Sequence, residues 1–136
     1  MRPPRLPRLR LILAAAASLA LFAACDGGPE PVPTDPTARW LASVDGLCEA
    51  LDHAGDAEAA ERAFVDRSHD ALHEIAAAAT EADREAAAAL LTAKNRVEAD
   101  FEDPPGRAEL EGHLQTLIAA TVDALTTLGI DAPGCA

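Results

Sequence analysis

The residues whose types and spacing best suit chemistry are two histidines and an aspartate in the segment ERAFVDRSHDALHEIA. His69 and His73 are four residues apart, so a helix would place them on one side, and Asp66 extends that line toward the N-terminus. Two imidazoles at this spacing chelate Zn²⁺, Cu²⁺ or Ni²⁺, and a carboxylate adds a third ligand. His113 is the only other histidine within a predicted helical face and is the candidate fourth ligand. These residues predict a divalent transition-metal site, and no other cofactor is expected.

The same residues have two further interpretations. The chain contains four histidines, so one pair at this spacing also arises by chance and is a weak signal. In the structural interpretation, Arg62 pairs with Asp66, and the histidines donate to carboxylates or carbonyls at the edge of a helical bundle. In the third interpretation, the imidazoles titrate near neutral pH and make the domain respond to pH. The sequence leaves these three interpretations open.

Catalytic patterns are missing around these residues. Ser68 and His69 are consecutive, and consecutive helical residues point about 100° apart, so they cannot share a proton. His73-Glu74 begins like the zinc motif H-E-x-x-H, but Ala occupies position 77. The chain has no tyrosine, and it contains no G-x-S-x-G or phosphate-loop motif. We therefore expect no enzyme activity.

Helices must position these side chains, and apolar residues at helical spacing predict four of them. The first runs from Pro36 to about His53, the second from Asp56 to Ala79, the third from a turn at 80–83 to Phe101, and the fourth from about 107 to a left-handed Gly129. Their faces include Trp40, Val44, Leu47 and Leu51; Phe64, Leu72 and Ile75; Leu90 and Val97; Leu110, Leu114 and Leu117. No segment shows the alternation of a strand. Short loops then predict an all-α, up-down-up-down four-helix bundle.

Composition limits the core and the partners of this bundle. The helices are rich in alanine, which favours helix but buries little area, so the core should be thin and the helices close. The chain has 11 basic and 23 acidic residues, and removing residues 1–24 takes away four arginines, which leaves a net charge of −16. Such a surface repels nucleic acid, so nucleic-acid binding is excluded.

The N-terminal residues 1–24 have the pattern of an export signal. Four arginines precede an apolar run of 14 residues from Leu11 to Ala24. This run is shorter than the about 20 residues of a transmembrane helix and fits a signal peptide. The following stretch, Leu21-Phe22-Ala23-Ala24-Cys25, resembles the lipobox of bacterial lipoproteins. The resemblance implies cleavage before Cys25, a diacylglyceryl group on its sulfur, and an extracytoplasmic protein held at the cell membrane by this lipid anchor.

The cysteine count agrees with export. The chain has three cysteines, and lipidation of Cys25 leaves Cys48 and Cys135 as a pair in a compartment that permits disulfides. In the bundle, the fourth helix ends beside the start of the first, and Cys48 lies about 15 Å along that first helix. An extended tail can reach that far. We therefore predict one disulfide, worth roughly 4–5 kcal/mol in the chain-entropy model, that staples the tail across the first helix.

Three segments follow from these observations: a signal peptide at 1–24, a lipidated cysteine and flexible Pro/Gly-rich tether at 25–34, and a helical domain at 35–136. The run Phe64, His69, Leu72, His73, with its alanine-rich helices and terminal Pro133-Gly134-Cys135, resembles small exported helical lipoproteins of GC-rich bacteria. That resemblance implies no particular activity. The predicted function is a membrane-anchored helical binding module for an envelope protein or a small ligand. The alternative is a metal-binding envelope lipoprotein that uses His69 and His73.

Overall fold

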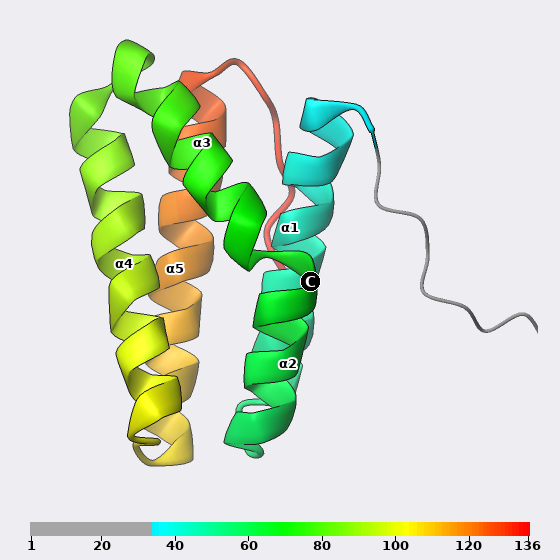
Figure 1. Cartoon of the computed structure of the whole chain (residues 1–136), viewed down its shortest axis with the longest axis vertical. Coiled ribbons are helices and arrows are strands. Elements are labelled where there is room, and N and C mark those ends of the chain that lie inside the picture. The colour runs from blue at the N-terminus through cyan, green and yellow to red at the C-terminus, as the bar shows by residue number, and fades with distance from the viewer. Residues whose placement is uncertain (1–33) are drawn as a thin grey trace, which may run out of the picture. The chain divides into compact units, whose positions relative to one another are not determined.

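The computed structural model describes residues 34–136, and every regular element in them is a helix. The five helices are α1 (Pro36–Asp52), α2 (Ala57–Arg67), α3 (His69–Ala82), α4 (Arg84–Glu102) and α5 (Arg107–Thr127), as Figure 1 shows. None of the helices in this part of the chain is long and apolar enough to span a membrane. The predicted signal peptide, Cys25 and the tether up to residue 33 lie outside the described residues.

Aspartates begin three of the helices. The carboxylates of Asp35 and Asp56 accept the backbone N–H three residues later, at 2.8 and 3.1 Å, and so cap α1 and α2. Asp83 caps α4 in the same way and accepts two N–H groups. The turn predicted at 80–83 is confirmed, but Thr80 does not begin the next helix, because its hydroxyl donates back to the carbonyl of Ala76 at 2.8 Å.

The end of α5 follows the predicted pattern. Gly129 has a φ of +74°, in the left-handed region that favours glycine. The N–H of Ile130 donates to the carbonyl of Leu125 at 3.0 Å, and the N–H of Gly129 donates to Thr126 at 2.9 Å. This hydrogen-bond pair is a Schellman motif, which turns the chain sharply out of the helix.

The prediction of four helices is wrong, because the second one is divided at Ser68. Ser68 leaves the helical conformation, and its hydroxyl donates to the carbonyl of Ser43 in α1 at 2.8 Å. This contact is possible because residue 46, opposite the break, is a glycine. A Cβ on Gly46 would lie only 2.5 Å from the Ser68 hydroxyl and 2.6 Å from the Arg67 Cβ. The predicted second helix is therefore interrupted where Ser68 contacts α1, and it forms the two helices α2 and α3.

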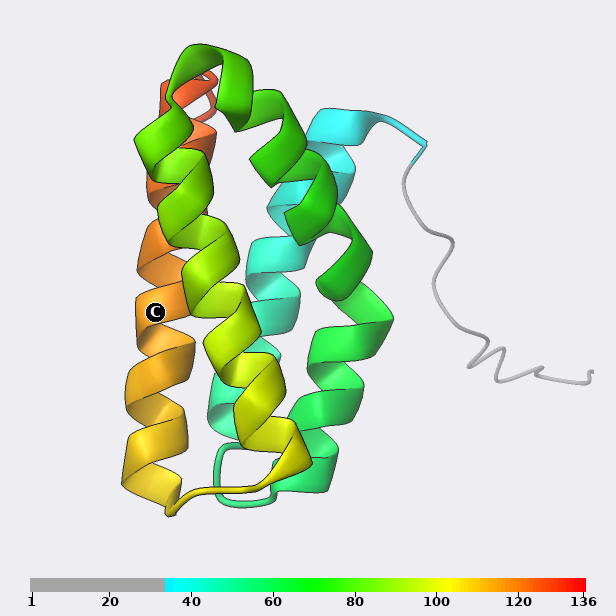
Figure 2. The same ribbon diagram turned by 60° about the vertical axis from the view of Figure 1, so that its left-hand side comes forward.

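The helices surround one apolar core. α1 packs against α2 and α5, and α4 packs against α3 and α5, so that the chain rises and descends along the long axis (Figures 1 and 2). Residues Pro31–Ala136 form one compact unit, which holds the whole described core. The largest apolar side chains at its centre are Leu47, Phe64, Leu72, Ile75, Leu90, Val97, Leu110, Leu114, Leu117 and Leu125.

One polar contact joins α1 to α3 at the edge of this core. Trp40 is half-buried and packs against the core, as predicted for an anchor. The Arg39 guanidinium and the Trp40 indole N–H both donate to the same oxygen of Glu74. These two hydrogen bonds hold the pKa of Glu74 below its ordinary value, and the bond from Arg39 has the larger effect.

The predicted disulfide is present. Cys48 in α1 and Cys135 in the C-terminal tail are bonded, with their Cα atoms 5.4 Å apart. The tail descends from the end of α5 and runs between α5 and α1 in Figure 1. Ala132 in this tail is buried, and Ile130 packs against the core. The all-helical class and the single staple are therefore confirmed, with five helices in place of four.

We predict that Gly46→Ala destabilises the domain, because its new Cβ must displace Ser68 or Arg67. Overpacking of this kind lowers the free energy of unfolding by about 1–3 kcal/mol. Gly112→Ala in α5 is the matched control, since no atom lies within 4 Å of its Cβ position. Gly112→Ala should raise the free energy of unfolding by about 0.5–1 kcal/mol. Urea unfolding measures both variants, and a stabilised Gly46→Ala would contradict the role given to this glycine.

Candidate functional site

The structure places two of the predicted metal ligands, His69 and His73, side by side but does not assemble the predicted set of four. His69 opens α3 and His73 follows one turn later, with ring centroids 5.1 Å apart. Asp66 belongs to α2, on the other side of the break at Ser68, and His113 is part of α5. Within residues 34–136, no group of three or more histidine, cysteine, aspartate or glutamate side chains is placed to hold a metal ion. We therefore do not propose a metal-binding function.

His69 instead belongs to an ion-pair chain between α3 and α4. Its Nε2 lies 3.1 Å from Oε1 of Glu98, and its Nδ1 lies 3.0 Å from Oδ1 of Asp70. The same Glu98 oxygen accepts from Nζ of Lys94 at 2.6 Å. Lys94 is only 2% exposed, which is rare for a lysine. Both nitrogens of His69 thus face carboxylates, and one of these, Glu98, is already engaged by the buried ammonium of Lys94.

His113 has a similar position between α5 and α4. Its Nδ1 lies 2.6 Å from Oδ2 of Asp100, a buried carboxylate that is 4% exposed. The guanidinium of Arg96 lies beside both groups and also reaches Glu109 at 3.3 Å. This arrangement agrees with the structural interpretation of the histidines. The Arg62–Asp66 pair of that interpretation is wrong, since Arg62 pairs with Glu58.

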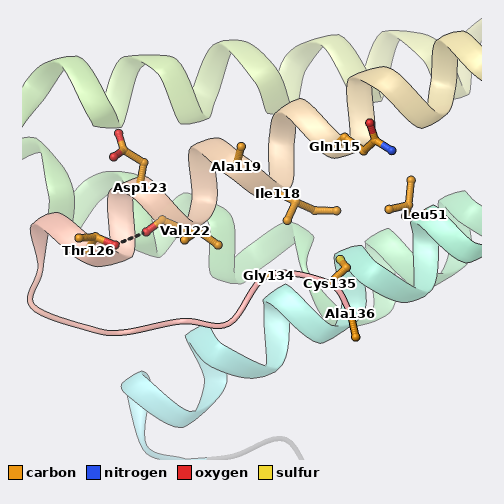
Figure 3. Close-up of a pocket in the computed structure, with 10 residues that line it drawn as sticks. All are labelled: Leu51, Gln115, Ile118, Ala119, Val122, Asp123, Thr126, Gly134, Cys135 and Ala136. Atoms are coloured by element: carbon orange, nitrogen blue, oxygen red, sulfur yellow. Dashed lines mark hydrogen bonds between the residues drawn. The ribbon is translucent and has the colours of Figure 1, made fainter.

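An apolar groove lies beside the C-terminal tail. It has a volume of about 670 Å³, in the range typical of small-ligand sites. In Figure 3, Ile118 and Val122 extend from α5 toward the tail, and Leu51 of α1 lies opposite Cys135. Residues 134–136 form one wall. The floor of this groove is therefore aliphatic, and the disulfide lies within its lining.

The polar groups of the groove lie along α5. Gln115, Asp123 and Thr126 are exposed lining residues, and the Thr126 hydroxyl is used within the helix, donating to the carbonyl of Val122 at 2.8 Å (Figure 3). Asp123 is the one charged side chain of the lining, and no lysine, arginine or histidine contributes. The groove can therefore hold an aliphatic body, and its one charge favours a neutral or positive polar end over a negative one.

A second, smaller hollow lies between α2 and α4. Its volume is about 430 Å³, and Phe64, Phe101 and Val65 form its apolar part. His69 and Glu98 line it, but they are already paired with each other. Two further glutamates, Glu61 and Glu102, complete the lining. This hollow is more polar than the groove at the tail, so the groove is the better candidate for binding.

The groove was not predicted from the sequence. The predicted face of the last helix comprised Leu110, Leu114 and Leu117, whereas Ile118 lies one position after Leu117 and Val122 lies four residues beyond Ile118. The signal was a second apolar line at a spacing of four residues beside the first. Lys94 was missed in the same way, because it lies four residues after Leu90 and three before Val97, on the buried face of its helix.

Comparison with protein-family models, curated proteins and solved structures finds no match to this chain.

We predict opposite effects for the two partners of the buried ion pair. Lys94→Met should leave stability unchanged or raise it, because an apolar side chain of similar length replaces a buried charge. Glu98→Ala should lower the free energy of unfolding by about 2 kcal/mol or more, because the ammonium of Lys94 then loses its acceptor. The loss should be smaller than for a fully buried pair, since the Glu98 side chain is 34% exposed. Thermal and urea unfolding at neutral pH measure both, and a larger loss for Lys94→Met would contradict this account.

Proposed function

We propose that the protein is a lipid-anchored, extracytoplasmic binding module whose groove takes a single-chain aliphatic amphiphile with a cationic end. The observation that carries this proposal is the apolar groove of about 670 Å³ between α5, Leu51 and the tail. The aliphatic lining of Ile118, Val122 and Leu51 suits an aliphatic chain, since burying each methylene group contributes about 0.8 kcal/mol. The amphiphile is thus recognised mainly by its apolar body.

Charge supports a cationic end for this ligand. Residues 34–136 contain 7 basic and 21 acidic residues. Six of the basic residues are already paired with carboxylates, at Arg39, Arg62, Arg67, Lys94, Arg96 and Arg107. The field around the groove is therefore negative, and Asp123 adds a carboxylate in its lining. An anionic amphiphile such as a fatty-acid carboxylate is disfavoured.

The anchor part of the proposal depends on the lipobox at Leu21–Cys25. A diacylglyceryl group on Cys25, together with N-acylation, would hold the domain at a membrane surface, where single-chain amphiphiles partition. The tether of residues 26–34 would then place the groove close to that surface.

For the anchor, we predict that the chain isolated from bacterial membranes begins at Cys25 and carries the lipid mass. Cys25→Ser should lose this mass, because the serine hydroxyl is not the acceptor of the lipid. Cys48→Ser is the control, which loses the disulfide and keeps the lipid. Intact-protein mass spectrometry measures all three. A wild-type chain without the lipid mass would contradict the anchor and leave the groove untested by this experiment.

For the groove, we predict that the oxidised unit Pro31–Ala136 binds dodecyltrimethylammonium more tightly than dodecyl maltoside, and dodecyl maltoside more tightly than dodecyl sulfate. Calorimetric titration below the critical micelle concentrations measures this order. Val122→Gln should weaken binding of the cationic probe about fivefold, a loss of about 1 kcal/mol from the lining. Asp123→Asn should reduce the preference for the cation over the neutral probe.

Val65→Gln on α2 is the matched control for Val122→Gln. Val65 is 53% exposed and lies outside the groove, so the same change of side chain there should leave binding unaltered. Equal weakening by both variants would show that the probe binds apolar surface in general. No binding of any of the three amphiphiles to the oxidised unit would overturn the proposed function.

A further inference from the structure

The C-terminal tail is a wall of the groove that one covalent bond holds in place. Beyond Ile130, whose N–H closes the end of α5, no hydrogen bond links residues 131–136 to the rest of the described chain. Their remaining attachments are the buried Ala132, the packing of the half-buried Cys135 against the core, and the bond from Cys135 to Cys48. The same short segment supplies Gly134, Cys135 and Ala136 to the lining of the groove. The bond that fixes the tail is therefore also the bond that completes the groove.

We infer that the Cys48–Cys135 disulfide is a redox gate for the ligand groove. This inference rests on the proposed function and adds its regulation. With the bond closed, the tail faces Ile118 and Val122 across the groove, as Figure 3 shows. With the bond open, residues 131–136 keep only one small buried side chain, and the ordering entropy of the six residues favours their release. The ligand then loses one wall of its site, while α5 and Leu51 remain.

The gate opens by thiol–disulfide exchange with a dithiol reductant. One thiolate of the dithiol attacks a sulfur of the disulfide and forms a mixed disulfide, and the other protein cysteine leaves as a thiolate. The second thiolate of the reductant then resolves the mixed disulfide. In total, the protein gains two electrons and two protons as the Cys48 and Cys135 thiols, and the reductant becomes a disulfide. The reverse exchange closes the gate.

The helices have separate means of holding together when the gate opens. Most of the core comes from the helices, with Leu47, Phe64, Leu72, Leu90 and Leu114 among its members, whereas residues 131–136 add only Ala132 and the half-buried Cys135. The α1–α2 contact is further held by the hydrogen bond from Ser68 to Ser43. Opening therefore removes a wall and exposes Val122 and Ile118, and the bundle remains helical.

Ligand binding and the disulfide are linked in both directions. If the oxidised domain binds the probe more tightly than the reduced domain, saturating probe must shift the thiol–disulfide equilibrium toward the disulfide by the same factor. This reciprocal shift separates a true gate from damage caused by the reductant, because it is measured in the redox equilibrium itself.

The test compares binding of dodecyltrimethylammonium to Pro31–Ala136 in the oxidised form, in the form reduced by dithiothreitol, and in Cys48→Ser/Cys135→Ser. Far-UV circular dichroism follows the helices in each form. We expect helical content to be kept and affinity to fall at least tenfold in both open forms. The ratio of dithiothreitol to its disulfide at the midpoint of reduction should rise by the same factor with saturating probe. Val65→Gln, outside the groove, should show the same redox shift as the wild type.

The possible results are distinguishable. Tight binding by the oxidised form with equal binding by both open forms would overturn the gate and leave the proposed function standing. Loss of the helical signal on reduction would also overturn the gate, since lost binding would then report unfolding. Failure of the oxidised form to bind would overturn the proposed function, and the gate with it.

Discussion

Where α1 crosses the junction of α2 and α3, Gly46 has no side chain, and the Ser68 hydroxyl and the Arg67 Cβ occupy the space that a Cβ on residue 46 would need. The Ser68 hydroxyl donates a hydrogen bond to the carbonyl of Ser43, and the chain leaves the helical conformation at Ser68, where it lies closest to α1. Alanine-rich helices bury little area each and gain packing energy only when they approach closely. The break at Ser68 allows α1 to approach closely, and α3 begins directly after it and packs against α4.

The direction of α3 decides what the histidines do. His69 is the first residue after the break, and it meets Glu98 of α4, whose carboxylate also accepts from the buried Lys94. A buried ammonium has to be hydrogen-bonded and neutralised, so this carboxylate is committed to it. The imidazole joins an existing ion pair and does not open a coordination site. His113 meets the buried Asp100 with the same result. Both pairs cross helix boundaries, so they tie α4 to its two neighbours.

The C-terminal tail forms one wall of a groove whose other lining residues belong to α1 and α5. A bundle with small side chains cannot cover all of its apolar surface, and the flank of α5 at Ile118 and Val122 faces the path of the tail. The disulfide brings the tail to α1 without filling that flank, so an apolar groove is left beside it. The bond that joins the tail to α1 thus also shapes the recess that we propose as its ligand site.

Local features of the sequence were sufficient to predict much of this structure. The helical class, the caps at Asp35 and Asp56, the turn before α4, the left-handed Gly129 and the disulfide depend on residue type, period and pairing along the chain. The break at Ser68 could not be predicted from such local features, because its cause is a glycine twenty-two residues earlier in another helix.

The candidate site depended even more on contacts between distant segments. A spacing of four residues places His69 and His73 together, but only the position of α4 brings the carboxylate of Glu98 against His69. The groove needs three segments, namely α1, α5 and the tail, in one relative position. By itself, the sequence therefore determined the helices, their ends and the cysteines available for a bond. The tertiary structure decided which side chains are satisfied and where the surface is hollow, because both depend on packing between residues far apart in the chain.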